Sequence, residues 1–139
     1  MKSKAPLSLM EQLVMLLVFA LAAALCLQVF VFSAQTSRWC EARDQAVTQV
    51  QNAAETVKAS NGDLRRCASL LGGTADDRTW RIGYDENWNI SETEADYQLI
   101  ITALPTEYAA LGSAEVLATT EAGEKLFGVT VSWQEVRGE

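Results

Sequence analysis

The sequence predicts an α+β protein in which a long N-terminal transmembrane helix continues into a small head with a four-stranded antiparallel sheet. Three observations lead to this prediction. Residues 7–34 form a nearly unbroken apolar run, and the apolar residues of 35–60 recur at steps of three and four, as on one face of a helix. After Thr74 they recur at every second position, which is the period of a strand. One face of such a sheet must be covered, and the amphipathic part of the helix supplies the covering layer.

The apolar run is long enough to cross a bilayer. It contains 28 residues, of which only five are polar, namely Ser8, Glu11, Gln12, Gln28 and Ser33. A helix of this length reaches roughly 42 Å, more than the ~30 Å hydrocarbon core. A secretory signal has a shorter apolar region, of roughly 7–15 residues, and Ser33-Ala34-Gln35 offers only a weak cleavage motif. We therefore expect residues 7–34 to be a retained transmembrane helix.

Positive charges before the run favour a cytoplasmic N-terminus. Lys2 and Lys4 precede it, and the cytoplasmic flanks of membrane helices carry an excess of Lys and Arg. We expect a single-pass protein of the cell membrane, with residues 1–6 as a cytoplasmic leader-like segment and the head outside the cytoplasm. Trp39, just past the run, is expected to anchor the chain at the membrane–water interface, where Trp is enriched.

Residues 35–60 are expected to continue the same helix as an amphipathic segment, because no Pro or Gly interrupts Leu7 to Ser60. Gly62 suits a left-handed cap after the helix. Residues 61–139 then begin with a short second helix that Asp63 can N-cap and that Gly72-Gly73 ends. The expected apolar face of the long helix consists of Trp39, Ala46, Val47, Val50, Ala53, Ala54 and Val57, and that of the short helix of Leu64, Cys67, Ala68 and Leu71.

Alternation after Thr74 predicts the strands. The first expected strand contains Trp80, Ile82 and Tyr84, and it resumes with Trp88 and Ile90 after a turn. The other expected strands run from Tyr97 to Ala103, from Glu115 to Thr120 and from Phe127 to Gln134. A Gly-containing hairpin loop is expected before the last strand. In that strand the expected apolar side consists of Phe127, Val129, Val131 and Trp133.

Charge and composition exclude several classes of function. Residues 35–139 hold nine Lys and Arg against 17 Asp and Glu, a formal charge of −8. A nucleic-acid surface needs basic clusters, so we expect none here. The chain has no His, which removes the usual catalytic triads and the commonest metal ligand, so we expect neither an enzyme nor a cofactor. Most of the four Trp residues lie at the spacing of strand residues, which is more typical of side chains that pack in the core or at a sheet edge than of a ligand-binding surface.

Two weaker sites remain open as alternatives. Cys40 and Cys67 could form a disulfide in an oxidising compartment, although about 30 Å of helix would separate them unless the chain doubles back. The residues Asp85, Asn87 and Asn89 match the start of a calcium loop. Its sixth position is Ile90 instead of Gly, and its twelfth is Asp96 instead of Glu, so a polar turn is the favoured interpretation.

The N-terminal motif resembles that of the type IV pilin and pseudopilin family. The match lies in "LSLMEQLVMLLVFALAAAL", where Leu7-Ser8-Leu9-Met10-Glu11 follows the family's prepilin signature and Ser8 stands for its Thr. The closing "LFGVTVSWQEV" resembles the last strand of minor pilins. The likeness covers the whole layout, whereas the specific motif covers about 25 residues.

The resemblance implies a minor pilin or pseudopilin of a type IV filament, secretion or DNA-uptake system. Its partners would be the lipid bilayer, other pilin-like subunits and a prepilin peptidase that cuts between Pro6 and Leu7. Glu11 would then neutralise the new amino group of a neighbouring subunit, and Gln12 would support a hydrogen bond between helices. Pro6 departs from the family, which has Gly there.

Two alternatives therefore stay open. Without cleavage the chain would be a non-polymerising, single-pass anchored protein whose acidic head binds a partner. Glu11 itself lies only roughly 6 Å along the helix from Leu7, where a carboxylate near the membrane edge is tolerated.

Overall fold

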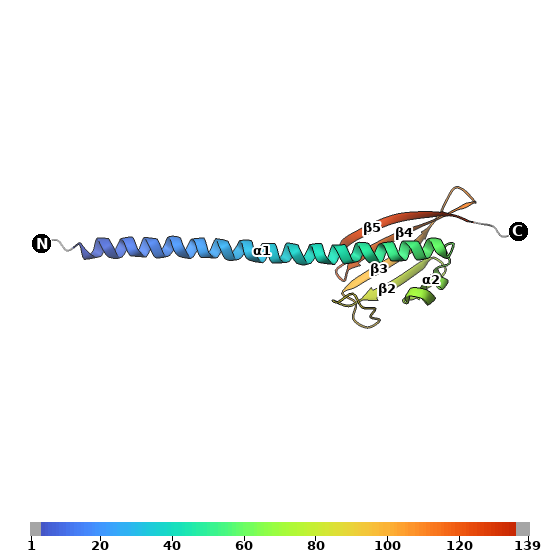
Figure 1. Cartoon of the computed structure of the whole chain (residues 1–139), viewed down its shortest axis with the longest axis horizontal. Coiled ribbons are helices and arrows are strands. Elements are labelled where there is room, and N and C mark those ends of the chain that lie inside the picture. The colour runs from blue at the N-terminus through green and yellow to red at the C-terminus, as the bar shows by residue number, and fades with distance from the viewer. Residues whose placement is uncertain (1–3, 136–139) are drawn as a thin grey trace. The chain divides into compact units, whose positions relative to one another are not determined.

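The computed structural model describes residues 4–135 and has the predicted α+β class (Figure 1). Its elements are α1 (Ala5–Ala59), α2 (Leu64–Leu71), β1 (Thr74–Ala75), β2 (Thr79–Tyr84), β3 (Tyr97–Leu104), β4 (Leu111–Thr120) and β5 (Lys125–Gln134). The chain divides into two compact units, Met1–Cys40 and Glu41–Glu139. We call the second unit, of which residues 41–135 are described, the head.

The described part of the first unit is helical from Ala5 onward, and all of its side chains are exposed. α1 contains an 18-residue stretch with a mean hydropathy of 2.8, so it is long and apolar enough to cross a membrane. Figure 1 shows α1 as one unbroken helix, as the lack of Pro and Gly predicted. A single long apolar helix of this kind indicates a membrane anchor.

Within the head, the last part of α1 covers the sheet with small side chains. The buried residues of this part are Ala46, Val50, Ala53, Ala54 and Val57, which confirms most of the predicted face. Val47 is only half-buried, and Trp39 belongs to the other unit and is 37% exposed. Three alanines on the covering face let a helix approach a sheet closely, because they add little volume between the two backbones.

The predicted end of α1 and the predicted start and end of α2 are confirmed, whereas α1 begins at Ala5 and not at Leu7. After α1, Gly62 has a φ of +79°, and its N–H donates to the carbonyl of Val57 over 2.9 Å, which closes the last turn. The Asp63 carboxylate accepts the N–H of Arg66 at 3.1 Å and so caps the start of α2. Gly72 ends α2 by donating its N–H to the carbonyl of Ala68.

The sheet has five strands rather than the expected four, all antiparallel and in chain order. The additional strand, β1, has only two residues, too few to leave a period in the sequence. β4 begins at Leu111, four residues before the expected start. The core-facing residues at that end of the strand are Gly112 and Ala114, and such small side chains give no apolar alternation.

One strand prediction is wrong. Trp88 and Ile90 do not resume a strand; only a single bridge between Tyr84 and Ile90 forms. Trp88 has a φ of +61°, in the left-handed region that strands do not use. The cause is a turn nucleated by Asp85, whose Oδ1 accepts the N–H groups of Asn87 and Asn89.

The apolar side chains of β5 lie on the core side of the sheet, as their alternation predicted. Phe127, Val129 and Val131 pair with buried residues of β4, so they lie on the core side of the sheet. Val129 is nevertheless 36% exposed, because β5 is an edge strand. A register shift between Ala118 and Thr119 makes Leu126 an additional buried residue, which the alternation of apolar residues did not predict.

Candidate functional site

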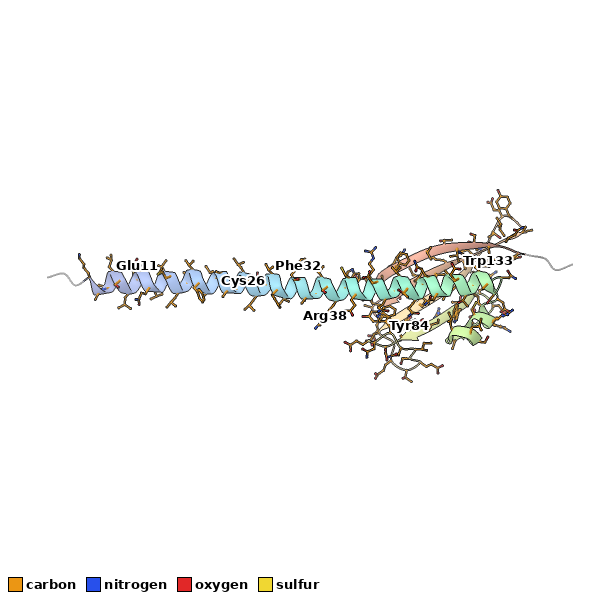
Figure 2. The ribbon with its side chains drawn as sticks, in the orientation of Figure 1. Glu11, Cys26, Phe32, Arg38, Tyr84 and Trp133 are labelled. Carbon is orange, nitrogen blue, oxygen red and sulfur yellow. The ribbon has the colours of Figure 1, made fainter. Side chains whose placement is uncertain are left out.

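Glu11 lies on the exposed apolar part of α1 (Figure 2). A helix places it on the same side as Leu7, Ser8 and Met15. Leu7 is 78% exposed and Met15 is 69% exposed, so its surroundings are open apolar surface. Among residues 4–135, no cation lies within ion-pair distance of the Glu11 carboxylate. In a membrane this carboxylate would need protonation, a polar headgroup or a charge from another chain.

The proposed processing site lies in the first turn of α1. The helix begins at Ala5, and the N–H of Ser8 donates to the carbonyl of Lys4 over 3.2 Å. Pro6 fits this turn, because the N–H that proline lacks would have no helical partner there. A cut after Pro6 would leave Leu7 as the first residue, with Glu11 one turn further along.

The three cysteines are free thiols in the structure. Cys26 and Cys40 are exposed, whereas Cys67 on α2 is fully buried. Burial raises the pKa of the Cys67 thiol, which keeps it protonated and poorly reactive. Cys67 is therefore part of the core, and its pairing with Cys40 stays an untested alternative.

The four tryptophans have separate roles. Trp80 is fully buried and donates its indole N–H to the carbonyl of Gly72. Trp88 stacks on Tyr97 with ring centroids 4.3 Å apart and planes 9° apart. Trp39 is 37% exposed on the first unit, and its role as an interfacial anchor stays a prediction. Trp80 and Trp88 therefore make separate contacts in the head.

Trp133 packs into a space that two glycines keep open. A Cβ at Gly62, after α1, or at Gly112, on β4, would overlap the Trp133 indole. Through this contact the end of β5 packs against the turn between α1 and α2. Its indole nitrogen is buried and has no hydrogen-bond partner within the described chain.

A hydrogen bond joins the opposite end of the sheet to α1. The Tyr84 hydroxyl donates to Oε1 of Gln49 over 3.4 Å, and burial raises the Tyr84 pKa. The ring of Tyr84 lies 5.6 Å from that of Trp88. Sequence alternation predicted that these aromatic residues pack in the core, but the hydrogen bond of Tyr84 to Gln49 had no signal in the sequence.

The Asp85 segment forms a polar turn. Asp85 accepts two backbone N–H groups at 2.9 Å on Oδ1, and the Asn89 side chain donates to Oδ2 at 3.4 Å. The backbone of Asp96 is held by a hydrogen bond, in which the N–H of Glu121 donates to the Asp96 carbonyl. Residues 4–135 contain no group of three or more His, Cys, Asp or Glu side chains arranged to hold a metal. The geometry favours the turn over the calcium alternative.

Asp85→Asn is expected to weaken the acid dependence of the head's stability. The hydrogen bond from the Asn89 N–H lowers the Asp85 pKa below its ordinary value of 3.8. A carboxylate whose folded pKa is lowered stabilises the fold above pH 3.8, and this contribution disappears as the pH falls below that value. The free energy of unfolding should therefore fall less steeply below pH 3.8 in the variant.

Denaturant titrations of the full chain in detergent at several pH values measure this effect. Glu86→Gln is the matched control, because Glu86 is exposed and accepts no hydrogen bond from the described chain. Identical pH profiles for Asp85→Asn and the wild type would contradict the role given to the Asp85 hydrogen bonds.

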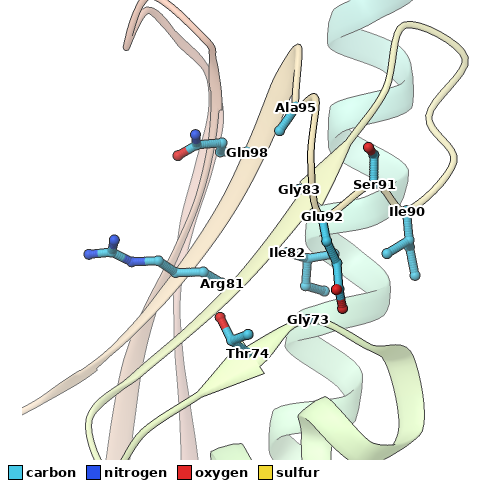
Figure 3. A pocket seen from close by; sticks show the side chains of 10 residues that line it. All are labelled: Gly73, Thr74, Arg81, Ile82, Gly83, Ile90, Ser91, Glu92, Ala95 and Gln98. Carbon is cyan, nitrogen blue, oxygen red and sulfur yellow. The ribbon is translucent and has the colours of Figure 1, made fainter.

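A cleft of about 410 Å³ lies beside this turn (Figure 3). Residues 90–95 fold back along β2, and a Cβ at Gly83 would lie 2.9 Å from that of Ala95. Figure 3 shows Glu92 projecting toward Gly73, whereas the Arg81 guanidinium extends away from Glu92. The cleft was missed because it depends on how the loop folds.

Comparison of the chain with known protein families, characterised proteins and solved structures finds no match. The architecture therefore has to be classified from its own features. A long apolar N-terminal helix whose last turns pack on an antiparallel sheet is a pilin-like arrangement.

Proposed function

We propose that this chain is a structural subunit of a pilin-like filament, as a minor pilin or pseudopilin in a type IV filament, secretion or DNA-uptake system. Glu11 is the observation that carries the proposal. It is an acidic residue on exposed apolar helix surface, without an ion-pair partner in the described chain, and fifth from Leu7. The amino group of a neighbouring subunit cut after Pro6 would supply the missing charge.

The distribution of polar residues on α1 supports packing against other helices. At 100° per residue, four of the five polar residues of 7–34 fall within about 100° of the helix circumference. These are Ser8, Glu11, Gln12 and Ser33. In a bilayer, polar and small side chains favour helix–helix contacts, because lipid offers them no hydrogen bonds. Gln28 lies on the opposite side.

A structural role, a cytoplasmic N-terminus and a head outside the cytoplasm are parts of the same proposal. The lack of His supports a structural over a catalytic role. Lys2 and Lys4 support the orientation. The acidic composition of residues 35–139 would keep the head away from anionic headgroups.

Replacing Glu11 by valine is expected to abolish co-assembly with pilin-like subunits and to leave membrane insertion unchanged. The change removes the charge that pairs with the neighbour's amine but retains the apolar span. Co-purification of filaments, together with membrane fractionation, measures both properties. Gln28→Val is the matched control, because it also replaces a polar residue by valine but on the other side of α1. Assembly of the Glu11→Val chain would refute the proposed contact.

Pro6 favours a second candidate function, a non-polymerising anchored protein whose acidic head binds a partner. Proline in place of the family's Gly should fit the peptidase poorly, because it fixes φ and has no N–H. The N-terminal mass of the purified chain separates the two candidates. A chain that starts at Leu7 supports the filament subunit, whereas an intact start at Met1 or Lys2 refutes processing and supports the anchored protein.

A further inference from the structure

The two edges of the sheet differ in how they are protected. At the first edge, β1 has only two residues, and the loop after β2 covers the remainder. There the N–H of Ser91 donates to the carbonyl of Gly83 over 2.9 Å, and Ile90 bridges to Tyr84. At the other edge, β5 has ten residues, and no described strand pairs with its outer side.

The open edge of β5 also lacks the features that normally prevent strand pairing. From Phe127 to Gln134 it contains no proline and no charged residue. The register shift lies before this segment, at Leu126. Natural edge strands usually carry prolines, charges or bulges that block the approach of a further strand. An unblocked edge of this length therefore indicates a surface that binds a strand.

The sequence of β5 is complementary to itself in one antiparallel register. When Thr130 lies opposite Thr130 of a copy, Phe127 lies opposite Trp133 and Val129 lies opposite Val131. Aromatic pairs, β-branched pairs and Thr–Thr pairs are the cross-strand neighbours that stabilise sheets. Lys125 and Glu135 flank the strand, so the antiparallel register brings opposite charges toward each other at both ends, whereas a parallel register would bring like charges together.

We propose that the free edge of β5 binds β5 of a second copy of this chain, antiparallel and with Thr130 on the two-fold axis. The same patch then serves both copies, as in any two-fold symmetric dimer. The register preserves the alternation of side chains, so the helix-covered faces of both heads lie on the same side of one continuous sheet.

This contact is distinct from the helix packing of the proposed filament and does not rest on it. Antiparallel strands related by this axis require residues 41–59 of the two copies to run in opposite directions. Subunits of a filament run in the same direction, and so do copies whose apolar helices cross one membrane with the orientation proposed above. The strand pairing is therefore an alternative to both arrangements and joins copies outside a shared membrane.

Cysteine cross-linking of the full chain in detergent tests the register. The exposed Cys26 and Cys40 are first replaced by serine, and Thr130→Cys and Ser132→Cys are compared in that background. Both positions are exposed. In the proposed dimer the Cα atoms of the two Thr130 residues lie about 5 Å apart, whereas those of the two Ser132 residues lie about 14 Å apart.

The expected result is a rapid disulfide dimer for Thr130→Cys and none for Ser132→Cys. Association through the membrane helices would not produce this difference between neighbouring positions of β5. Equal cross-linking at both positions would indicate a parallel or unspecific contact and would overturn the proposal. The absence of a dimer at both positions would overturn it as well.

A charge on the two-fold axis tests the same contact without a cross-link. Thr130→Lys places two like charges opposite each other and is expected to weaken dimerisation about tenfold. Gln98→Lys adds the same charge to an exposed position on the central strand β3 and should leave dimerisation unchanged. The dimer dissociation constant is measured by analytical ultracentrifugation in detergent. An unchanged constant for Thr130→Lys would refute the pairing.

Discussion

Trp80→Ala is expected to lower the free energy of unfolding of the head by about 4 kcal/mol, the usual cost of removing a fully buried tryptophan. Trp80 is 0% exposed and belongs to the core between α1 and the sheet. Its indole N–H also donates to the carbonyl of Gly72 over 2.9 Å. Truncation therefore leaves a cavity and removes the partner of the carbonyl that ends α2.

Denaturant titration of the full chain, followed by circular dichroism, measures this loss. Trp39→Ala is the matched control, because Trp39 is 37% exposed and lies outside the head. Trp80→Phe should lie between the two, since it fills most of the space but donates no hydrogen bond. Equal stability of Trp80→Ala and Trp39→Ala would contradict the central place of Trp80 in the core.

Gly112→Ala is the second large effect, with an expected loss of about 2–3 kcal/mol. The new Cβ would overlap the indole of Trp133, which is also held by Gly62. Because Trp133 has glycine on two sides, it cannot move away from the new methyl group without leaving its site. The free energy of unfolding from denaturant titration measures the cost.

A double-mutant cycle shows whether the cost comes from this contact. Trp133→Ala removes the group with which the new methyl group collides, so Gly112→Ala should cost much less in that background. Equal costs of Gly112→Ala in the two backgrounds would show that the glycine serves the backbone alone and not the tryptophan.

The long helix and the main strands could be predicted because their side-chain periods follow directly from burial on one face. β1 and the start of β4 could not, since a two-residue strand has no period and Gly112 has no side chain. Trp88 misled the prediction because the hydrogen bonds of Asp85 override its preference for a strand. Local polar contacts of this kind leave no periodic signal.

The candidate sites divide in the same way. Glu11 and Gln12 could be found from the sequence, because a charge in an apolar run is a local feature. The open edge of β5 could not, because it depends on the order of the strands in the sheet. The packing of Trp133 against Gly62 depends on the same long-range arrangement.

The strands lie in the sheet in the order in which they are synthesised. Each strand after β1 therefore finds its neighbour already present when it leaves the ribosome, and no later strand has to be inserted between two earlier ones. α1 is synthesised first, so its core-facing surface stays exposed until the sheet has formed. Three alanines on that face keep the exposed apolar area small. The edge that stays open in the finished head is that of the strand made last.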